Sequence, residues 1–312
     1  MKIAVLGGGG AMGGFFGGSL AEAGYDTVLV DVSAPAVDAI NSTGLHIEER
    51  DGSARTVRVA ASRDPASVGQ VDLILNFVKS YHTAEAIRSA GPMIGPETSI
   101  LSLQNGWGNA ARIAEVVGER RVLVGLTYHA AMLLGPGRVR HPATGTTYVG
   151  EINGETSERL TSIVDALGRA GLDVTASEHI LEEVWKKLAL NASTLPIATI
   201  LRLFAHELLQ HDGAIKLMRS LLDEVVAVAA SQAIVLDHDE RWEAITGILE
   251  RAVGGKGSML QDVEARRRTE IDVINGAIVD AGQRSGVPTP LNAAMVWLVN
   301  SIQEAYLAEA KG

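Results

Sequence analysis

The chain contains no cysteine, which excludes disulfide bridges, cysteine-ligated zinc and thiol nucleophiles together. A chain without disulfides fits a reducing compartment, and we expect a cytoplasmic protein. Aromatic residues make up only 4% of the 312 residues, and the 27 lysines and arginines are outnumbered by 37 aspartates and glutamates. The resulting net charge of −10 argues against a nucleic-acid partner, because phosphate binding needs a basic surface.

Long hydrophobic runs are also lacking. The longest weakly polar stretch, residues 225–236, contains Ser231 and Gln232 and is too short to span a bilayer. The apolar run at residues 1–6 is too short for the hydrophobic part of a signal peptide. The histidines are scattered and form no carboxylate–histidine cluster. We therefore expect no membrane partner and no metal site.

Glycine is abundant instead, and four glycines stand together directly after the first apolar run. A strand, a glycine-rich turn, a helix and an acid after the next strand form the dinucleotide-binding fingerprint. Such a turn lets the backbone approach a pyrophosphate, and the start of the helix offers N–H groups to its charge. Two glycine frames fit, one with Gly8 and Gly10 and one with Gly7 and Gly9, and Gly13 belongs to both. The residues expected to contact the cofactor are Gly8, Gly9, Gly10, Ala11, Met12 and Gly13.

The acid of this fingerprint is Asp31, 18 residues after Gly13. A carboxylate there can accept hydrogen bonds from the adenine ribose hydroxyls, whereas a 2′-phosphate would meet a like charge. The sequence therefore favours NAD(H) as cofactor, with NADP(H) remaining possible. The alternative role for Asp31 is to cap the next helix, for which Ser33 is the better candidate.

The first half of the chain alternates β-branched runs with helical segments, which predicts a parallel sheet with helices on both faces. Expected strands are 2–6, 27–30, 71–78, 99–103 and 122–126, and expected helices are 11–23, 34–42, 82–94 and 109–117. A hairpin of residues 44–49 and 55–60 is expected around Asp51-Gly52, because that dipeptide is a turn signal. Residues 139–141 and 147–149 are expected to add a small antiparallel extension.

From about residue 175 the pattern changes to long helices, with apolar residues at helical spacing. The expected helices are 180–195, 203–232, 239–253, 258–285 and 290–310. The predicted fold class is thus α/β, with a Rossmann-type doubly wound domain over residues 1–172 and an all-helical domain over residues 173–312.

Three further segments carry a family resemblance. Gln104-Asn-Gly-Trp-Gly-Asn109 follows an expected strand, and Trp185-Lys-Lys-Leu-Ala-Leu-Asn191 opens the helical half. Ser258-Met-Leu-Gln-Asp-Val263 stands ahead of Glu270-Ile-Asp272 and Asn275-Gly276. In this order the set resembles the ketopantoate reductase family, from Met1 to about Val287. The resemblance implies NAD(P)H-dependent reduction of a 2-oxo acid to a 2-hydroxy acid. It also implies that the helical domain binds the substrate and forms a homodimer.

The resemblance also implies roles for single residues. Lys187 matches the catalytic lysine, and Glu270 matches an acid beside that lysine and the nicotinamide ribose. Asn191 and Ser258 match substrate-binding residues, and Asn105 matches an asparagine that touches both cofactor and substrate. Cofactor contacts are further implied for Lys79 and for the backbone of Ala131. The chemistry is consistent, because hydride transfer to a ketone develops charge on oxygen that a lysine can stabilise and protonate.

The chain departs from the family pattern at two kinds of position. Leu195-Pro196 stands where the family usually has Asn-Pro, and Ala205 falls near another substrate-contacting asparagine. With Leu195 in the site, the loss of two polar contacts favours a less hydroxylated or more apolar substrate than ketopantoate. Asp31 replaces the basic residue with which the family often reads the 2′-phosphate.

Simpler interpretations remain for each of these residues. Lys187 could be a solvated helix lysine, Asn191 a buried amide, Glu270 a partner of Arg266, and Asn105 part of an ordinary turn. We interpret His129 as structural. Two other functions also stay open: an NAD-dependent 2-hydroxy acid dehydrogenase acting on a more apolar substrate, and an NAD-sensing module without turnover.

Overall fold

A computed structural model describes residues 1–309 of the chain, which separate into two compact units. Unit 1 contains residues 1–104 and 109–180, and unit 2 contains residues 105–108 and the chain from Leu181 onward. The division falls after Ile180, whereas the sequence places it after residue 172. No helix within residues 1–309 is long and apolar enough to cross a membrane.

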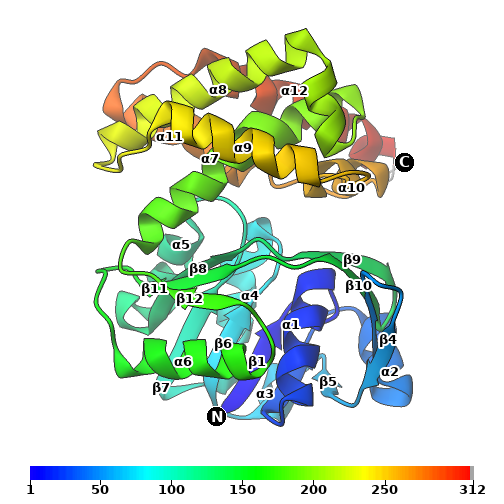
Figure 1. The fold of residues 1–312 in the computed structure, drawn as a ribbon. Coiled ribbons are helices and arrows are strands. Elements are labelled where there is room, and N and C mark those ends of the chain that lie inside the picture. Colours follow the sequence, from blue (N-terminus) through cyan, green and yellow to red (C-terminus); the bar gives the residue numbers. More distant parts are fainter. Residues whose placement is uncertain (310–312) are drawn as a thin grey trace. The chain divides into compact units, whose positions relative to one another are not determined.

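The main sheet of unit 1 has the order β12-β11-β8-β7-β6-β1-β2-β5 within the described residues (Figure 1). Its strands are β1 (Lys2–Leu6), β2 (Asp26–Val30), β5 (Ala60–Ser62), β6 (Val71–Asn76), β7 (Ile94–Ser102), β8 (Val122–Thr127), β11 (Thr147–Glu151) and β12 (Val174–Ala176). The six neighbouring strands β8, β7, β6, β1, β2 and β5 are parallel, and β11 pairs with β8 in antiparallel direction. The predicted α/β class with a Rossmann-type sheet is confirmed.

Helices cover both faces of this sheet, as the alternation predicts. They are α1 (Ala11–Glu22), α2 (Ala34–Thr43), α3 (Pro65–Val68), α4 (Thr83–Ser89), α5 (Asn109–Val117) and α6 (Glu158–Arg169), with η1 (Ser80–His82), η2 (Gly91–Met93) and η3 (Glu119–Arg121) between them. Successive side chains of a strand point to opposite faces, so Val5 packs with Phe16 of α1 while Ala4 packs with Ile87 of α4. The two apolar clusters thus hold α1 and α4 on opposite faces of the sheet.

A second sheet of unit 1 has the order β4-β3-β10-β9. Its strands are β3 (Leu45–Glu49), β4 (Ala54–Val57), β9 (Ala130–Gly135) and β10 (Arg138–Ala143). The hairpin around Asp51-Gly52 is confirmed by the antiparallel pairing of β3 and β4. Residues 147–149 extend the main sheet in antiparallel pairing with β8, as expected, whereas residues 139–141 belong to the second sheet, parallel to β3 and antiparallel to β9. Val139 is buried and lies against Gly14 of α1, which draws β10 into the second sheet.

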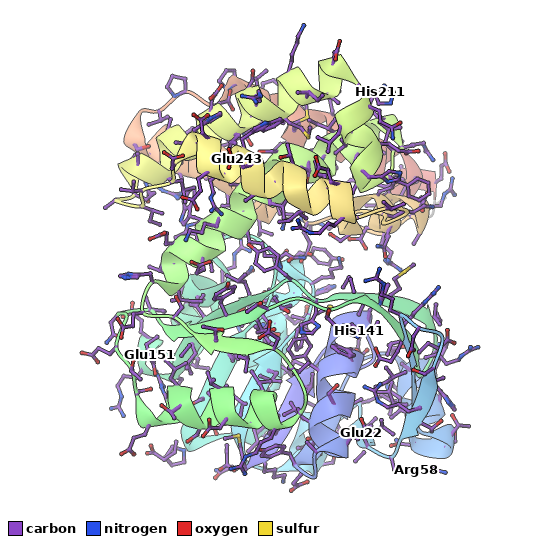
Figure 2. All side chains as sticks on the ribbon, in the orientation of Figure 1. Glu22, Arg58, His141, Glu151, His211 and Glu243 are labelled. Atoms are coloured by element: carbon purple, nitrogen blue, oxygen red, sulfur yellow. The ribbon has the colours of Figure 1, made fainter. Side chains whose placement is uncertain are left out.

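One buried acid ties the edge of the main sheet to α6. Glu151, labelled in Figure 2, is only 6% exposed, and its carboxylate accepts hydrogen bonds from Ser157 and Arg159. Burial raises the pKa of Glu151, but these two partners outweigh burial and hold the pKa below its usual range. The contact closes the loop between β11 and α6.

Unit 2 is helical, as predicted, but three helix boundaries differ from the prediction. Its elements are α7 (Ile180–Leu201), η4 (Ala205–Gln210), α8 (Asp212–Ser231), α9 (His238–Arg251), α10 (Ser258–Glu264), η5 (Ile271–Val273), α11 (Asn275–Ser285) and α12 (Pro290–Glu309). The helix expected to end at 195 continues through Pro196, and the helix expected over 203–232 is interrupted at His211. The expected end of the last helix at residue 310 lies outside the described residues.

The largest difference concerns the helix expected over residues 258–285. Arg266 takes a left-handed backbone (φ 53°), which ends α10 after seven residues. The segment that follows is tied to α12, because the backbone N–H and hydroxyl of Thr269 both donate to Oε1 of Gln303 (2.9 Å each). Residues 265–274 therefore form a loop with one short 3-10 turn, and Glu270 lies within it.

Candidate functional site

The glycine turn of unit 1 is built so that side chains are excluded at its two ends. Gly7 has φ +75°, and a Cβ there would lie 3.0 Å from the backbone nitrogen of Val78. A Cβ on Gly13 would lie 2.3 Å from the carbonyl oxygen of Gly7. Gly7 therefore makes the turn after β1, and Gly13 lets α1 start directly against it. A Cβ on Gly8 would lie 2.6 Å from Cβ of Leu29, and one on Gly9 would lie 2.8 Å from Cβ of Ala36, so both predicted frames contain positions that exclude a side chain.

The start of α1 presents backbone donors to the space beyond the turn. Gly10 is the N-cap residue of α1 and, as a glycine, offers no side chain to cap the helix. The first helical hydrogen bond runs from Gly14 N to Gly10 O. The N–H groups of Ala11, Met12 and Gly13 thus have no acceptor within the helix. Three such donors at the positive end of a helix suit a pyrophosphate. The predicted cradle residues therefore fit a dinucleotide.

Asp31 follows β2 directly and reaches back to the glycine turn. Its Oδ2 accepts a hydrogen bond from Gly9 N and its Oδ1 accepts one from Ser33 N, each 2.9 Å long. Ser33, not Asp31, caps α2, since the Ser33 hydroxyl accepts from Ala36 N (3.4 Å). Each carboxylate oxygen keeps a second lone pair, so Asp31 can still accept a ribose hydroxyl.

Lys79 stands in the loop after β6, next to the Phe77–Val78 peptide that Gly7 approaches. Gln104 fixes this loop, because its Nε2 donates to Val78 O (2.7 Å) and to Thr83 Oγ1 (2.8 Å). Ala131 lies on β9 and packs against the same apolar cluster as Met12 of α1. The backbone of Lys79 thus directly follows the peptide that Gly7 approaches, and Ala131 packs against the apolar cluster that holds α1.

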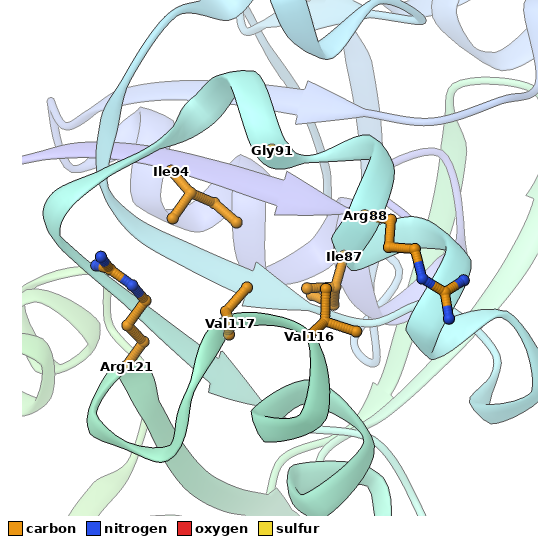
Figure 3. A pocket seen from close by; sticks show the side chains of 7 residues that line it. All are labelled: Ile87, Arg88, Gly91, Ile94, Val116, Val117 and Arg121. Carbon is orange, nitrogen blue, oxygen red and sulfur yellow. The ribbon is translucent and has the colours of Figure 1, made fainter.

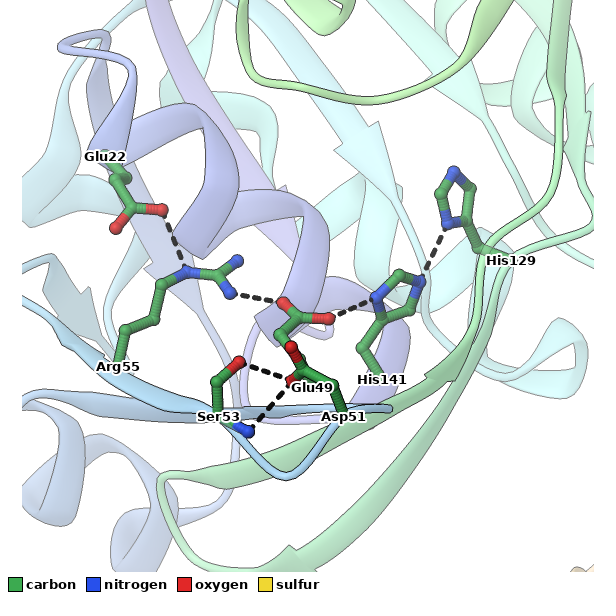
Figure 4. A network of polar contacts seen from close by, with 7 residues as sticks. All are labelled: Glu22, Glu49, Asp51, Ser53, Arg55, His129 and His141. Atoms are coloured by element: carbon green, nitrogen blue, oxygen red, sulfur yellow. Dashed lines mark hydrogen bonds and ion pairs between the residues drawn. The ribbon is translucent and has the colours of Figure 1, made fainter.

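His129 belongs to a buried polar network in unit 1, shown in Figure 4. Its Nδ1 lies 2.9 Å from Nε2 of His141, whose Nδ1 lies 2.8 Å from a carboxylate oxygen of Glu49. Glu49 also contacts Arg55, and Phe15 of α1 stacks on His141 with ring centroids 3.9 Å apart. Burial, together with His141, lowers the pKa of His129 to about 4, so its ring is neutral at pH 7.

In unit 2 the structure brings together Lys187, Asn105 and Glu270, three residues that are far apart in the sequence. The Nζ atom of Lys187, on α7, donates to Oδ1 of Asn105 (2.8 Å). Glu270 is 8% exposed and interacts electrostatically with Lys187. Burial lowers the pKa of Lys187 to about 8, and the Glu270 carboxylate opposes that shift. Lys187 is therefore not a solvated surface lysine.

Asn191 and Leu195 follow Lys187 at intervals of four residues, which places the three on one face of α7. All three side chains are partly buried. A Cβ on Gly257 would lie 2.8 Å from Cδ2 of Leu195, so Leu195 packs against the residue before Ser258. Ser258 is exposed and begins α10.

Ala205 contacts the loop of residues 254–257, which precedes Ser258, because its backbone N–H donates to Gly255 O (3.0 Å). The two positions that depart from the family pattern, Leu195 and Ala205, therefore meet the loop of residues 254–257. One apolar side chain and one methyl group stand where polar side chains were expected.

Sequence reasoning missed how the loop of Asn105 is held. Trp107 N donates to Val273 O (2.8 Å), and a Cβ on Gly106, which has φ +87°, would lie 2.4 Å from that same oxygen. The loop of Asn105 is therefore docked on the segment that carries Glu270. The signal in the sequence was the Asn-Gly pair at 105–106, which indicates a turn but not its partner.

Two pockets of the described structure contain none of the predicted site residues. A pocket of about 390 Å³ in unit 1 is lined by residues of α4, α5 and neighbouring turns, among them Ile87, Val116 and Arg121 (Figure 3). A pocket of about 560 Å³ in unit 2 is lined mainly by apolar residues of α7, α8 and α12. The candidate chemistry therefore rests on the side-chain geometry described above.

The chain matches two family models, "Ketopantoate reductase PanE/ApbA" over residues 3–154 and its C-terminal counterpart over residues 179–303. The 2-dehydropantoate 2-reductase of Pyrococcus horikoshii is 32% identical over 305 residues, covering 98% of each chain. The one from Halobacterium salinarum is 29% identical over 303 residues, covering 97% of this chain and 99% of that protein.

Solved structures agree with this assignment. A ternary structure of D-mandelate dehydrogenase with NADH and anilino(oxo)acetate has a TM-score of 0.93 at 29% identity, covering 98% of this chain and 99% of that one. A ketopantoate reductase from Ralstonia eutropha has a TM-score of 0.90 at 32% identity, covering 98% of this chain and all of that one. The chain therefore belongs to the ketopantoate reductase family, and it is an NAD(P)-dependent oxidoreductase that reduces a 2-oxo acid to a 2-hydroxy acid.

Proposed function

We propose that this enzyme reduces an apolar 2-oxo acid with NADH, and that Lys187 protonates the carbonyl oxygen. The observation that carries the proposal is the cluster in which Lys187 Nζ donates to Asn105 Oδ1 (2.8 Å) beside the buried Glu270. A bound nicotinamide would supply the hydride to the carbonyl carbon. Lys187 then polarises the oxygen that gains charge and delivers a proton to it.

The surroundings of Lys187 suit a proton donor. An ordinary lysine holds its proton too tightly at neutral pH, but burial lowers the pKa of Lys187 to about 8. Asn105 accepts one N–H of the ammonium group and so orients it. Glu270 supplies negative charge that keeps the lysine protonated below pH 8.

Leu195 and Ala205 support an apolar substrate. Leu195 lies on the Lys187 face of α7 and packs against Gly257, next to Ser258, the proposed partner of the substrate carboxylate. A hydroxyl group of the substrate would find no partner at either position. D-mandelate dehydrogenase, whose structure holds anilino(oxo)acetate, has the same overall fold, and we propose an aryl or branched alkyl group at the corresponding end of the substrate here.

The preference for NADH is proposed on the basis of Asp31. Its carboxylate is anchored by Gly9 and Ser33 at the end of β2, where it can accept a ribose hydroxyl but would repel a 2′-phosphate. Gly7 to Gly13 would hold the pyrophosphate, with Lys79, Asn105, Ala131 and Glu270 as further cofactor contacts. NADP(H) remains the weaker cofactor in this proposal.

Two alternatives stay distinct from it. The same site could work in the oxidative direction as a 2-hydroxy acid dehydrogenase, since the lysine that gives a proton to an alkoxide can take one from an alcohol. An NAD-sensing module without turnover would leave the Lys187 cluster without a purpose. Homodimer formation and a cytoplasmic location also stay predictions.

The test is a panel of 2-oxo acids with NADH and, separately, NADPH, followed by the loss of absorbance at 340 nm. The panel should contain ketopantoate, a straight-chain, a branched and an aryl 2-oxo acid. We expect the highest kcat/KM for a branched or aryl acid with NADH. A ketopantoate kcat/KM at least equal to all others would overturn the substrate proposal, and turnover of none would favour the sensing module.

A further inference from the structure

Three buried or partly buried polar side chains of unit 2 form a hydrogen-bonded series that includes none of the substrate-binding residues proposed above. Glu224 of α8 accepts hydrogen bonds from Leu291 N (2.8 Å) and from Nδ2 of Asn292 (2.7 Å). Oδ1 of Asn292 in turn accepts from Nδ2 of Asn275 (2.9 Å), and both asparagines are 0% exposed. Burying polar groups this completely costs free energy unless they are paired, so the position of these three side chains in the core needs a reason.

The charge of Glu224 fixes the direction of both amides. A carboxylate only accepts, so Asn292 must turn its Nδ2 toward Glu224 and its Oδ1 toward Asn275. Asn275 must therefore donate with Nδ2, which has a second hydrogen left. That second hydrogen goes to the carbonyl oxygen of Ala192 in α7 (2.9 Å).

The carbonyl of Ala192 is available because of Pro196. In an α-helix it would accept from the N–H four residues later, but that residue is Pro196, which has no N–H. Asn275 supplies the missing donor from a different element. One side chain thus joins α7, which carries Lys187 and Asn191, to the first residue of α11.

Asn275 also ends the segment that carries Glu270. Residues 269–275 are held at three points: Thr269 is bound by Gln303, Val273 O accepts from Trp107 N, and Asn275 is bound to α7. The contact at Val273 holds the loop of Asn105, and the contact at Asn275 holds the helix of Lys187. The segment is therefore the common support of the three residues of the Lys187 cluster.

We propose that Asn275 is a positioning residue for the reaction: by binding the Ala192 carbonyl that Pro196 leaves open, it holds the Glu270 segment in register with Lys187 on α7. This inference rests on the proposed roles of Lys187 and Glu270. Asn275 itself touches neither substrate nor cofactor and acts through the placement of Glu270.

Two substitutions separate two roles of Asn275: positioning the Glu270 segment, and merely donating a hydrogen bond to the Ala192 carbonyl. Asn275→Ala removes the donor to Ala192, and Pro196→Ala restores an N–H that can donate to the same oxygen within the helix. The double variant P196A/N275A therefore keeps the carbonyl paired but lacks the connection between α7 and the Glu270 segment. Pro196→Ala alone is the control for the change in the helix.

For each variant we would measure the melting temperature, NADH affinity by fluorescence, kcat, and the pH dependence of kcat/KM for the 2-oxo acid. We expect N275A to melt at a lower temperature and P196A/N275A to recover most of that loss. In both we expect kcat to fall about tenfold, as for a misplaced catalytic group. The upper limb of the pH profile should move to lower pH as Glu270 withdraws, while NADH affinity changes less than twofold.

Recovery of kcat and of the pH profile in P196A/N275A would overturn the inference, because Asn275 would then only satisfy a carbonyl. Unchanged kcat and an unchanged profile in a folded N275A would overturn it as well. Lys187→Ala, measured alongside, keeps the two levels apart. If K187A retains parental activity, the proposed role of Lys187 fails, whereas a loss in K187A with none in N275A removes only the role of Asn275.

Discussion

Lys187 Nζ and Asn105 Oδ1 lie 2.8 Å apart, although 82 residues separate them in the chain. An amide oxygen neutralises none of the lysine charge, so it orients the ammonium group without stabilising it as a carboxylate would. The carboxylate of the cluster is Glu270, which acts on Lys187 electrostatically. Orientation and charge are thus supplied by two different residues.

The first prediction concerns pH. Burial lowers the pKa of Lys187 to about 8, and reduction needs its protonated form, so kcat/KM for the 2-oxo acid should be level below pH 8. Above pH 8 it should fall about tenfold for each pH unit. Oxidation of the 2-hydroxy acid needs the neutral lysine, so its kcat/KM should rise about tenfold for each unit up to pH 8 and be level above it. Initial rates at saturating cofactor from pH 6 to 10 check both.

Asn105→Asp tests whether the fall of kcat/KM above pH 8, the upper limb of the pH profile, is caused by Lys187. A carboxylate 2.8 Å from Nζ favours the charged lysine, so the limb should move to higher pH even where the absolute rate is lower. Asn153→Asp, an exposed loop change in unit 1, is the matched control and should leave the limb in place. A limb that stays near pH 8 in N105D would assign it to another group.

The second prediction concerns the choice of cofactor. Asp31→Asn removes the charge but keeps an acceptor oxygen, so kcat/KM with NADPH should rise relative to NADH by about tenfold, the scale of one removed charge contact. Ser33→Ala removes the cap of α2 without changing charge and should leave the ratio as it is. Equal kcat/KM for the two cofactors in the parent enzyme would contradict the role of Asp31.

The third prediction concerns the substrate. If Leu195 and Ala205 line the side-chain end of the site, Leu195→Asn should raise kcat/KM for ketopantoate relative to an apolar 2-oxo acid. One hydrogen bond gained or lost at a buried group is worth about 1–3 kcal/mol, or roughly 5- to 150-fold in this ratio. Leu201→Asn, at an exposed position on the same helix, is the control. An unchanged ratio in L195N would place Leu195 outside the site.

The fourth prediction concerns stability in acid. The pKa of His129 falls from 6.5 to about 4 on folding, so between these values the unfolded chain binds the extra proton. Stability from this group is complete above pH 6.5 and is lost as the pH falls toward 4, by up to about 3 kcal/mol.

Urea unfolding at pH 7 and pH 5 measures this loss. His129→Gln should flatten the pH dependence, since the amide cannot take up the proton, while His82→Gln at an exposed position should not. The same slope in H129Q and the parent would show that other groups, such as Glu49, dominate the acid response.

The sequence predicted the glycine turn after β1, the place of Asp31 directly after β2 and the change from an α/β half to a helical half, because each depends on local pattern. A glycine run directly after an apolar strand is typical of a turn that leads into a helix, and the helical spacing of apolar residues is visible in any window of the second half. What it could not predict depends on contacts between distant residues. Arg266 adopts a left-handed backbone that its residue type does not favour, and this breaks the helix expected over 258–285.

The candidate site shows the same division. The four-residue spacing of Lys187 and Asn191 predicts that they share one helix face, whereas the contact of Asn105 with Lys187 needed the folded chain. The helix expected over residues 180–195 stops directly before Pro196, which has no backbone donor. The helix continues through Pro196, and Asn275, 79 residues further along, donates to the carbonyl that Pro196 leaves open. No local pattern carries this information.

The central claim is that Lys187 gives the proton and stabilises the developing charge, and Lys187→Ala tests it most directly. The measurement is kcat for the best 2-oxo acid with saturating NADH, together with the dissociation constant of NADH for the same variant. We expect kcat to fall by about 10²–10³, the scale of losing an electrophilic donor, with NADH affinity changed less than threefold. A folded K187A enzyme that binds NADH and turns over within about threefold of the parent rate would contradict the claim.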